Sequence, residues 1–175
     1  MAVNTEKKRG RFFLRAKIIS VNTSCKKGER KTPQRYINLE PGGITGDAHF
    51  GSENLREVSI LDWSSVVKLM SKNPEGALKI KISPGDFAEN ITTDKLEIKS
   101  ISPGDTLAIY TKDSGGDNKV ILKITAIGKK CHNSCPIKDA MGECAKPREG
   151  LFASVVKGGM IKPGDEIELI KNESA

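Results

Sequence analysis

The sequence contains no long apolar run, and its short apolar stretches fall far short of the ~20 residues that a membrane-spanning helix needs. The opening residues, MAVNTEKKRGRFF, are basic but lack the apolar core and the small-residue cleavage site of a signal peptide. We therefore expect a cytoplasmic protein without membrane contact. In a reducing cytoplasm, clustered cysteines indicate metal binding or thiol chemistry rather than structural disulfides.

Aromatic residues are scarce, at 5% of the chain, although the formal net charge is +7. Proteins that bind single-stranded nucleic acid usually combine a basic groove with aromatic side chains on which bases stack. The main basic runs are confined to residues 7–11 and 26–31. Both observations argue against a nucleic-acid partner. A positive surface around a small anionic ligand accounts for the charge equally well.

No linker or shift in composition divides the 175 residues, so we expect a single domain over 1–175. Short runs that alternate apolar and polar residues predict strands with one buried face. These runs are 15–21, 56–61, 78–83, 95–100, 106–110, 120–127 and 166–170. Many short strands with few helices predict a mostly β, barrel-like fold.

Turn and helix signals lie between these strands. The tripeptide Pro-Gly-Asp occurs three times, and its proline and glycine suit the two central positions of a type II turn. One helix is predicted at 63–73, where Asp62 can cap the first turn. A second is predicted at 148–159, beginning after Pro147 and ending at a pair of glycines.

The glycine-rich segment 42–61 has the features of a binding loop. Glycines such as Gly46 let a backbone approach a ligand closely, and Asp47 can orient the ring of His49. Arg56 offers a planar guanidinium that suits phosphate or carboxylate. The alternative is a turn-rich connection that carries a surface histidine.

A second segment, 84–93, places Glu89 and Asn90 just before an apolar run. Their side chains can hydrogen-bond to neighbouring loops or to a bound polar group. Loop stabilisation is the simpler of the two interpretations.

Thiol-bearing residues gather in the third segment, 128–152. Its candidate ligands for a structural zinc are Cys131, His132, Cys135 and Cys144. Adjacent residues seldom ligate one ion, and the segment has no second Cys-x2-Cys pair, which weakens the zinc interpretation. Lysines before the cluster and Arg148 after it favour a reactive thiolate instead.

Taken in order, these segments resemble the MOSC domain, which is found at the C-terminus of molybdenum cofactor sulfurases. The resemblance spans about residues 14–171 and is closest to small stand-alone bacterial members. It rests on GDAHFG, REVSIL, GDFAENITT, ISPGDTLAI, IGKKCHNSCPI, PREGLFASVVKGG and IKPGDEIEL.

The resemblance implies a barrel-like MOSC fold that binds the molybdenum cofactor, molybdopterin. It further implies that a late cysteine carries sulfur or ligates molybdenum. Cys135 fits that position best, with Cys131 and Cys144 as the other candidates. The expected cofactor-binding residues are Gly46, Asp47, His49, Arg56, Glu89, Asn90 and Arg148.

The expected activity is therefore sulfur transfer to the molybdenum cofactor. The sulfur would come from a cysteine desulfurase or another donor, and a molybdoenzyme would be the acceptor. Two alternatives remain open at this point: a cofactor carrier or sensor without turnover, and a non-enzymatic module stabilised by zinc. Structural zinc would make the fold depend on the metal.

Overall fold

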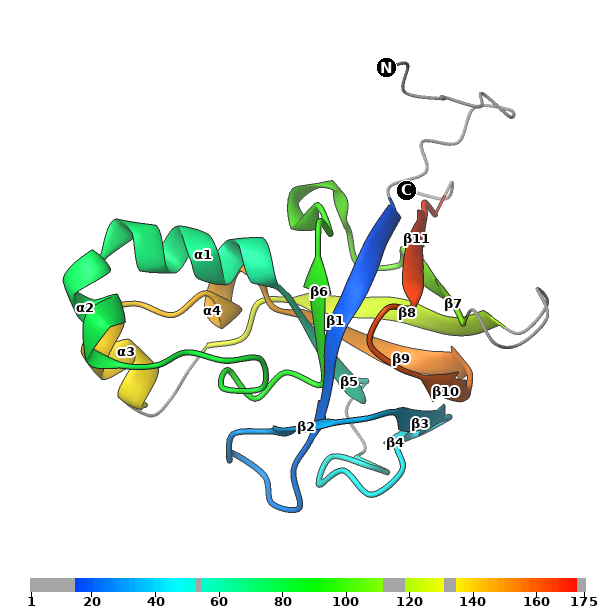
Figure 1. Cartoon of the computed structure of the whole chain (residues 1–175). Coiled ribbons are helices and arrows are strands. Elements are labelled where there is room, and N and C mark those ends of the chain that lie inside the picture. The colour runs from blue at the N-terminus through cyan, green and yellow to red at the C-terminus, as the bar shows by residue number, and fades with distance from the viewer. Residues whose placement is uncertain (1–14, 53–54, 112–118, 131–134, 173–175) are drawn as a thin grey trace.

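The computed structural model describes residues 15–52, 55–111, 119–130 and 135–172. Seven strands form a closed barrel, which β1 completes by pairing with β11 (Figure 1). Around the barrel the order is β11 (Glu166–Ile170), β7 (Thr106–Tyr110), β8 (Lys119–Ile127), β9 (Leu151–Lys157), β5 (Val58–Asp62), β6 (Ile91–Asp94) and β1 (Arg15–Thr23). Neighbouring strands are antiparallel except β5 and β6, which are parallel. The predicted mostly β, barrel-like fold is confirmed.

Two further layers flank the barrel. Strand β2 (Thr32–Gln34) pairs with the end of β1, and a small separate sheet contains β10 (Gly159–Ile161), β3 (Ile37–Glu40) and β4 (Gly43–Ile44). The helices gather on one side of the barrel (Figure 1). They are α1 (Trp63–Lys72), α2 (Pro74–Lys79), α3 (Pro136–Met141) and α4 (Lys146–Glu149). None of the helices in the described ranges is both long and apolar enough to cross a bilayer.

Two hydrophobic clusters hold these layers together. Alternate side chains of the strands fill the barrel, as the buried and exposed residues of β1 show. The second cluster lies between the barrel and the helices, and includes Leu61, Leu69, Phe87, Ile137 and Met141. Each fully buried aliphatic side chain contributes roughly 1.5–3 kcal/mol. The helical layer is therefore attached to the barrel by its own apolar contacts.

The three Pro-Gly-Asp tripeptides form the predicted turns. Their glycines, Gly85, Gly104 and Gly164, have φ of +94°, +97° and +93°. In each turn the aspartate accepts a hydrogen bond at 2.8 Å from the backbone N–H three residues earlier. This side-chain bond spans the Pro-Gly pair and closes the turn, which explains why aspartate follows glycine each time.

The helix predicted at 63–73 is α1, and its cap is confirmed. Asp62 accepts a hydrogen bond from the backbone N–H of Ser64 at 3.0 Å. The helix ends at Asn73, whose side chain then accepts from the backbone N–H of Gly76 and begins α2.

Three predicted elements are wrong. The first residues of 78–83 complete α2, and Ile80 and Ile82 pack against the second cluster instead of pairing in the sheet. No strand forms at 95–100. The strand in this part of the chain is β6 (Ile91–Asp94), which ends before Lys95 because that residue has a φ of +66°. A 3-10 turn, Ile98–Ser100, follows. The helix predicted at 148–159 is the strand β9, whose residues alternate between the barrel core and its outer face.

Candidate functional site

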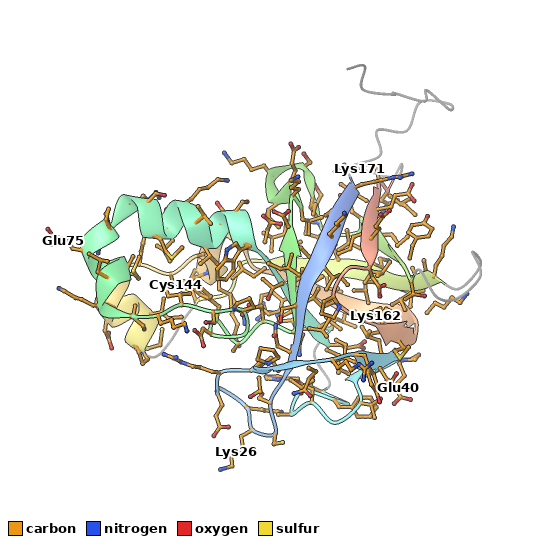
Figure 2. All side chains as sticks on the ribbon, in the orientation of Figure 1. Lys26, Glu40, Glu75, Cys144, Lys162 and Lys171 are labelled. Carbon is orange, nitrogen blue, oxygen red and sulfur yellow. The ribbon has the colours of Figure 1, made fainter. Side chains whose placement is uncertain are left out.

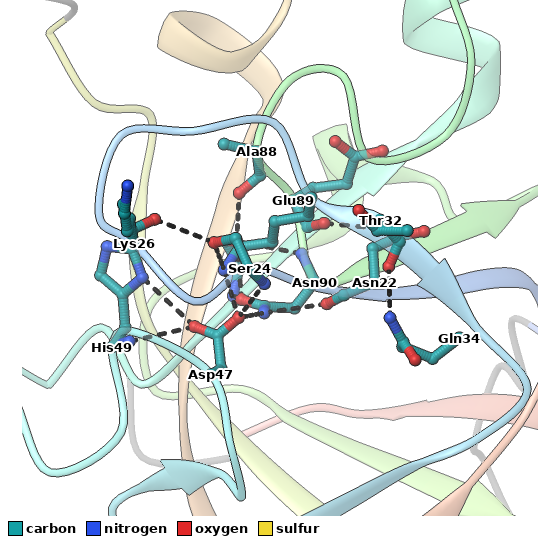
Figure 3. Close-up of polar contacts among 12 residues, drawn as sticks. Asn22, Ser24, Lys26, Thr32, Gln34, Asp47, His49, Ala88, Glu89 and Asn90 are labelled. Atoms are coloured by element: carbon teal, nitrogen blue, oxygen red, sulfur yellow. Dashed lines mark hydrogen bonds and ion pairs between the residues drawn. The ribbon is translucent and has the colours of Figure 1, made fainter.

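Asp47 lies at the centre of a buried polar network (Figure 3). Its Oδ2 accepts hydrogen bonds from Lys31 Nζ at 2.5 Å, the backbone N–H of Ser24 at 3.1 Å and Asn90 Nδ2 at 3.2 Å. Its Oδ1 accepts from the backbone N–H of His49 at 3.1 Å and lies 3.3 Å from His49 Nδ1. One carboxylate thus joins three loops that are distant in sequence.

This network determines which ring nitrogen of His49 donates a hydrogen bond to Asp47. Burial raises the pKa of Asp47, but hydrogen bonds from His49 and Lys31 outweigh it and leave the pKa lowered. The carboxylate therefore only accepts hydrogen bonds, so Nδ1 of His49 must be the donor. This leaves Nε2 as the imidazole nitrogen that does not face Asp47, on a side chain 35% exposed. The structure thus brings together Asp47 and His49 as the sequence predicts.

The side-chain amide of Asn90 forms hydrogen bonds with other residues of the protein. Its Oδ1 accepts from the backbone N–H and the hydroxyl of Ser59 at 3.1 and 3.0 Å. Its Nδ2 donates to Asp47 and to the backbone carbonyl of Asn22, each at 3.2 Å. All four hydrogen-bonding positions of the amide are occupied, so Asn90 ties its loop to the barrel strand β5.

Glu89 lies beside this joint and is fully buried. Its Oε1 accepts hydrogen bonds from the backbone N–H of Gly85 at 2.6 Å and from Thr92 Oγ1 at 2.7 Å. Its Oε2 has no partner among the described residues. Burial raises the pKa of Glu89, against the opposing effect of these hydrogen bonds and of the charge on Lys146. Glu89 therefore binds its proton more tightly than an exposed glutamate does.

Two cations lie against one aromatic ring on the outer face of the barrel. The guanidinium carbon of Arg56 is 5.1 Å from the centroid of Phe152, and Lys146 Nζ is 5.7 Å from it. Lys146 also donates to the backbone carbonyls of Phe87 and Ala88, each at 3.0 Å. Arg56 is exposed and makes no ion pair with any residue in the described ranges. No described residue accepts a hydrogen bond from its guanidinium, whose N–H donors suit an anion.

Lys146 has an unusual proton affinity. Burial lowers the pKa of Lys146 to about 8, and the charges of Lys31 and Lys129 act in the same direction. The charges of Glu89 and Cys144 oppose them. These side chains therefore lie within electrostatic reach of one amine, which links the buried network to the cysteine-bearing segment.

The cysteines divide between described and undescribed residues. Cys135 is half-buried, and its sulfur accepts from the backbone N–H of Lys138 at 3.5 Å, so it caps α3. Cys144 is half-buried on the connection from α3 to α4 (Figure 2). Both pack against the second hydrophobic cluster. Cys131 and His132 lie outside the described residues.

No metal-binding cluster is evident within the ranges that the structure covers. No group of three or more His, Cys, Asp or Glu side chains there is arranged to hold an ion. The predicted zinc site needs Cys131 and His132, so half of its ligands lie outside those ranges. That interpretation stays a prediction.

The remaining predicted site residues have other positions. Gly46, with φ of +81°, forms the turn that leads from β4 to Asp47. Arg148 is exposed and pairs with Glu143, its Nη2 lying 3.6 Å from Oε2. Its guanidinium is therefore already engaged, in contrast to that of Arg56.

Sequence reasoning missed three residues of this site: Lys31, Lys146 and Phe152. Lys31 stands in a basic run that reads as a solvated surface, and Lys146 is a single lysine before a proline. Phe152 falls in the segment wrongly predicted as a helix. Nothing in the sequence distinguishes a buried lysine from an exposed one, because burial depends on the loops that fold over it. The Pro-Gly-Asp turn at 84–86 was the available signal for such a loop.

Comparison with solved structures identifies the same fold in three bacterial proteins. YuaD from Bacillus subtilis superposes with a TM-score of 0.68 and 19% identity, over 93% of this chain and 100% of YuaD. YiiM from Escherichia coli gives 0.61 and 18%, over 92% of this chain and 72% of YiiM. YiiM from Geobacillus stearothermophilus gives 0.64 and 16%, over 91% and 77%.

No curated protein matches the sequence of this chain. The MOSC domain model, in contrast, matches residues 45–168. That interval contains Asp47, His49, Arg56, Lys146 and Phe152, and it covers well over half of the 175 residues. The chain therefore belongs to the MOSC domain family.

Proposed function

We propose that this domain binds the molybdenum cofactor at the surface formed by Arg56, Phe152 and Lys146, called the cation–aromatic surface below. Membership of the MOSC family, which is associated with that cofactor, supports the proposal. The observation that carries it is the pair of cations held against one ring. One of them, Arg56, is exposed and without an ion-pair partner in the described part of the chain.

The chemistry of these side chains fits the cofactor. A pterin phosphate is anionic, and guanidinium and ammonium groups are both suited to hold phosphate. The cofactor would supply the metal and its sulfur chemistry. Nδ1 of His49 is fixed by Asp47, which leaves Nε2 to exchange a hydrogen bond or a proton with a polar group. The buried network around Asp47 stabilises the loop that carries His49.

Sulfur transfer is the reaction we propose for the neighbouring cysteines. A cysteine thiolate attacks the outer sulfur of a persulfide on the donor, and the donor's S–S bond breaks as its cysteine leaves as a thiolate. A cysteine desulfurase is the expected donor and a molybdoenzyme the expected acceptor. Among the described cysteines, the charge of Cys144 acts on Lys146, whereas Cys135 caps a helix. We therefore propose both Cys144 and Cys135 as candidate sulfur carriers.

Equilibrium binding tests the cofactor proposal. The purified chain is titrated with cofactor released from a molybdoenzyme, and pterin fluorescence is followed at low and high salt. We expect saturable binding that weakens with salt and falls about tenfold or more in Arg56→Ala/Lys146→Met. Arg148→Ala is the matched control, because that arginine pairs with Glu143 instead. Equal affinities for wild type and the double variant would contradict the proposal.

Mass spectrometry tests the sulfur proposal separately. Incubation with a persulfide donor should add roughly 32 Da, the mass of one sulfur atom, to a thiol. We expect Cys144→Ala or Cys135→Ala to lose the adduct, and Cys25→Ala, which removes an exposed thiol, to keep it. Labelling that persists in the Cys135→Ala/Cys144→Ala double variant would move the assignment to Cys131. A domain that binds cofactor but takes up no sulfur would be a carrier or a sensor.

A further inference from the structure

The segment that leads into β5 crosses the outer face of β9. Strand β9 lies between β5 and β8 in the barrel (Figure 1). Leu55 comes just before β5, yet its backbone carbonyl accepts a hydrogen bond at 2.5 Å from the hydroxyl of Thr125, which belongs to β8. Residues 55–57 therefore reach across β9, the strand that carries Phe152. This crossing brings the guanidinium of Arg56 over the Phe152 ring.

Thr125 is the extra residue of a β-bulge. Its two neighbours in β8 pair with Phe152 and Ala153, which are consecutive in β9, so Thr125 has no residue opposite it. Bulges commonly re-aim a side chain next to a functional site. The Thr125 hydroxyl also lies 3.1 Å from the backbone carbonyl oxygen of Phe152. A hydroxyl has one proton, so the shorter contact, to Leu55, is the stronger of the two hydrogen bonds.

A second contact fixes the other end of the crossing segment. Glu57 Oε2 accepts a hydrogen bond at 2.8 Å from the backbone N–H of Val155, beside another register shift between β8 and β9. Arg56 therefore has an anchored residue on each side. An exposed arginine side chain loses conformational freedom when it binds a ligand, and prior ordering of its backbone lowers that cost.

We propose that Thr125 is a positioning residue for the cation–aromatic surface. Its single hydroxyl contacts the carbonyl of Leu55, the residue before Arg56, and the carbonyl of Phe152, the residue that supplies the ring. It thereby holds the guanidinium over the ring before an anion arrives. The identity of that anion rests on the function proposed above, whereas the positioning is a property of the chain alone.

Nuclear magnetic resonance of the full chain without ligand tests the positioning. The Phe152 ring shifts the guanidinium protons of Arg56 upfield while they lie over its face, and Phe152→Leu gives their position without the ring. Thr125→Val keeps the shape of the side chain but has no hydroxyl, and should lose most of this ring-current shift. Thr125→Ser should keep it. The matched control is Thr93→Val, which removes a hydroxyl that donates to Asp62 at 2.8 Å and should leave the shift unchanged.

Cofactor titrations show what the positioning contributes to binding. Pterin fluorescence should give an affinity about three- to tenfold weaker in Thr125→Val, the effect expected of one hydrogen bond. In an Arg56→Ala background the same change should have no effect, because the side chain that Thr125 positions is gone.

Three results would each overturn the inference: an unchanged Arg56 shift in Thr125→Val, a shift lost equally in Thr93→Val, or equal losses of affinity with and without Arg56. A wild-type chain that binds no cofactor would instead contradict the proposed function. The ring-current measurement needs no ligand, so it decides the role of Thr125 in either case.

Discussion

Lys31 Nζ and Asp47 Oδ2 are 2.5 Å apart, and each of the two side chains is only 1% exposed. The pair joins the loop after β1 to the loop after β4. Asn90 binds the same carboxylate oxygen from a third loop. The two charges of a buried ion pair attract strongly at short distance. Removing either partner leaves the other charge buried and uncompensated, which is strongly destabilising. The loops around the proposed cofactor site are therefore fixed by one pair of charges.

Asp47→Asn should strongly destabilise the protein. The change leaves the Lys31 ammonium buried without its counter-charge, and we expect a loss of about 3–5 kcal/mol in the free energy of unfolding. Denaturant unfolding measures it. Glu143→Gln is the control, because that carboxylate pairs with exposed lysine and arginine side chains and should cost less than about 1 kcal/mol. Similar losses in the two variants would show that the buried pair has no special role.

The contribution of Asp47 should disappear in acid. Its pKa in the folded protein lies below its ordinary value of 3.8, so the folded state binds the proton less tightly than the unfolded state. The stability it supplies is therefore present above that value and is lost as the pH falls through the lowered pKa. The difference in unfolding free energy between wild type and Asp47→Asn should shrink between about pH 5 and pH 2. A difference that stays constant over that range would contradict this assignment.

Gly85→Ala should cost more than the same change in a sister turn. Both Gly85 and Gly164 have a positive φ, +94° and +93°. A Cβ at Gly85 would lie 2.1 Å from the carbonyl oxygen of Lys31, whereas one at Gly164 would meet nothing within 4 Å. We expect Gly164→Ala to cost about 1–2 kcal/mol from its backbone alone. Gly85→Ala should lose about 1–3 kcal/mol more from the clash. Equal melting temperatures for the two variants would refute the close packing on Lys31.

Binding of anions at the cation–aromatic surface should depend on the protonation of Lys146. The pKa of Lys146 is about 8, so its ammonium charge is lost as the pH rises through that value. Affinity for the pterin phosphate should therefore fall between about pH 7 and pH 9. Lys146→Arg keeps its charge over this range and should show a flat profile. An identical decline in that variant would mean that another group controls the binding.

The sequence correctly locates the strands in which apolar and polar residues alternate. Strands β7 and β11 have the bounds that alternation predicts, because the two strands pair with each other along their full length. Alternation also misleads, as at 78–83, where Ile80 and Ile82 pack against the cluster between the barrel and the helices. The strand β9 escaped prediction because Pro147 and the closing glycines suggest helix ends, although the proline starts only the short α4.

Among the site residues, contacts between sequence neighbours could be predicted, whereas contacts between distant residues could not. Asp47 and His49 are close in sequence, so their contact can be inferred from spacing alone. The contact of Lys31 with Asp47 spans 16 residues, and that of Lys146 with the carbonyl of Phe87 spans 59. Such pairs depend on how loops fold across the barrel. One sequence cannot supply that information.

Co-purification of cofactor tests the central claim most directly. The chain and its Arg56→Ala/Lys146→Met variant are each purified from a molybdenum-replete host, and bound molybdenum and pterin are measured per chain. We expect both to accompany the wild-type protein in equal amounts and to be largely absent from the variant, while both proteins remain folded. Wild-type protein free of pterin, or a variant that retains as much as wild type, would contradict the claim.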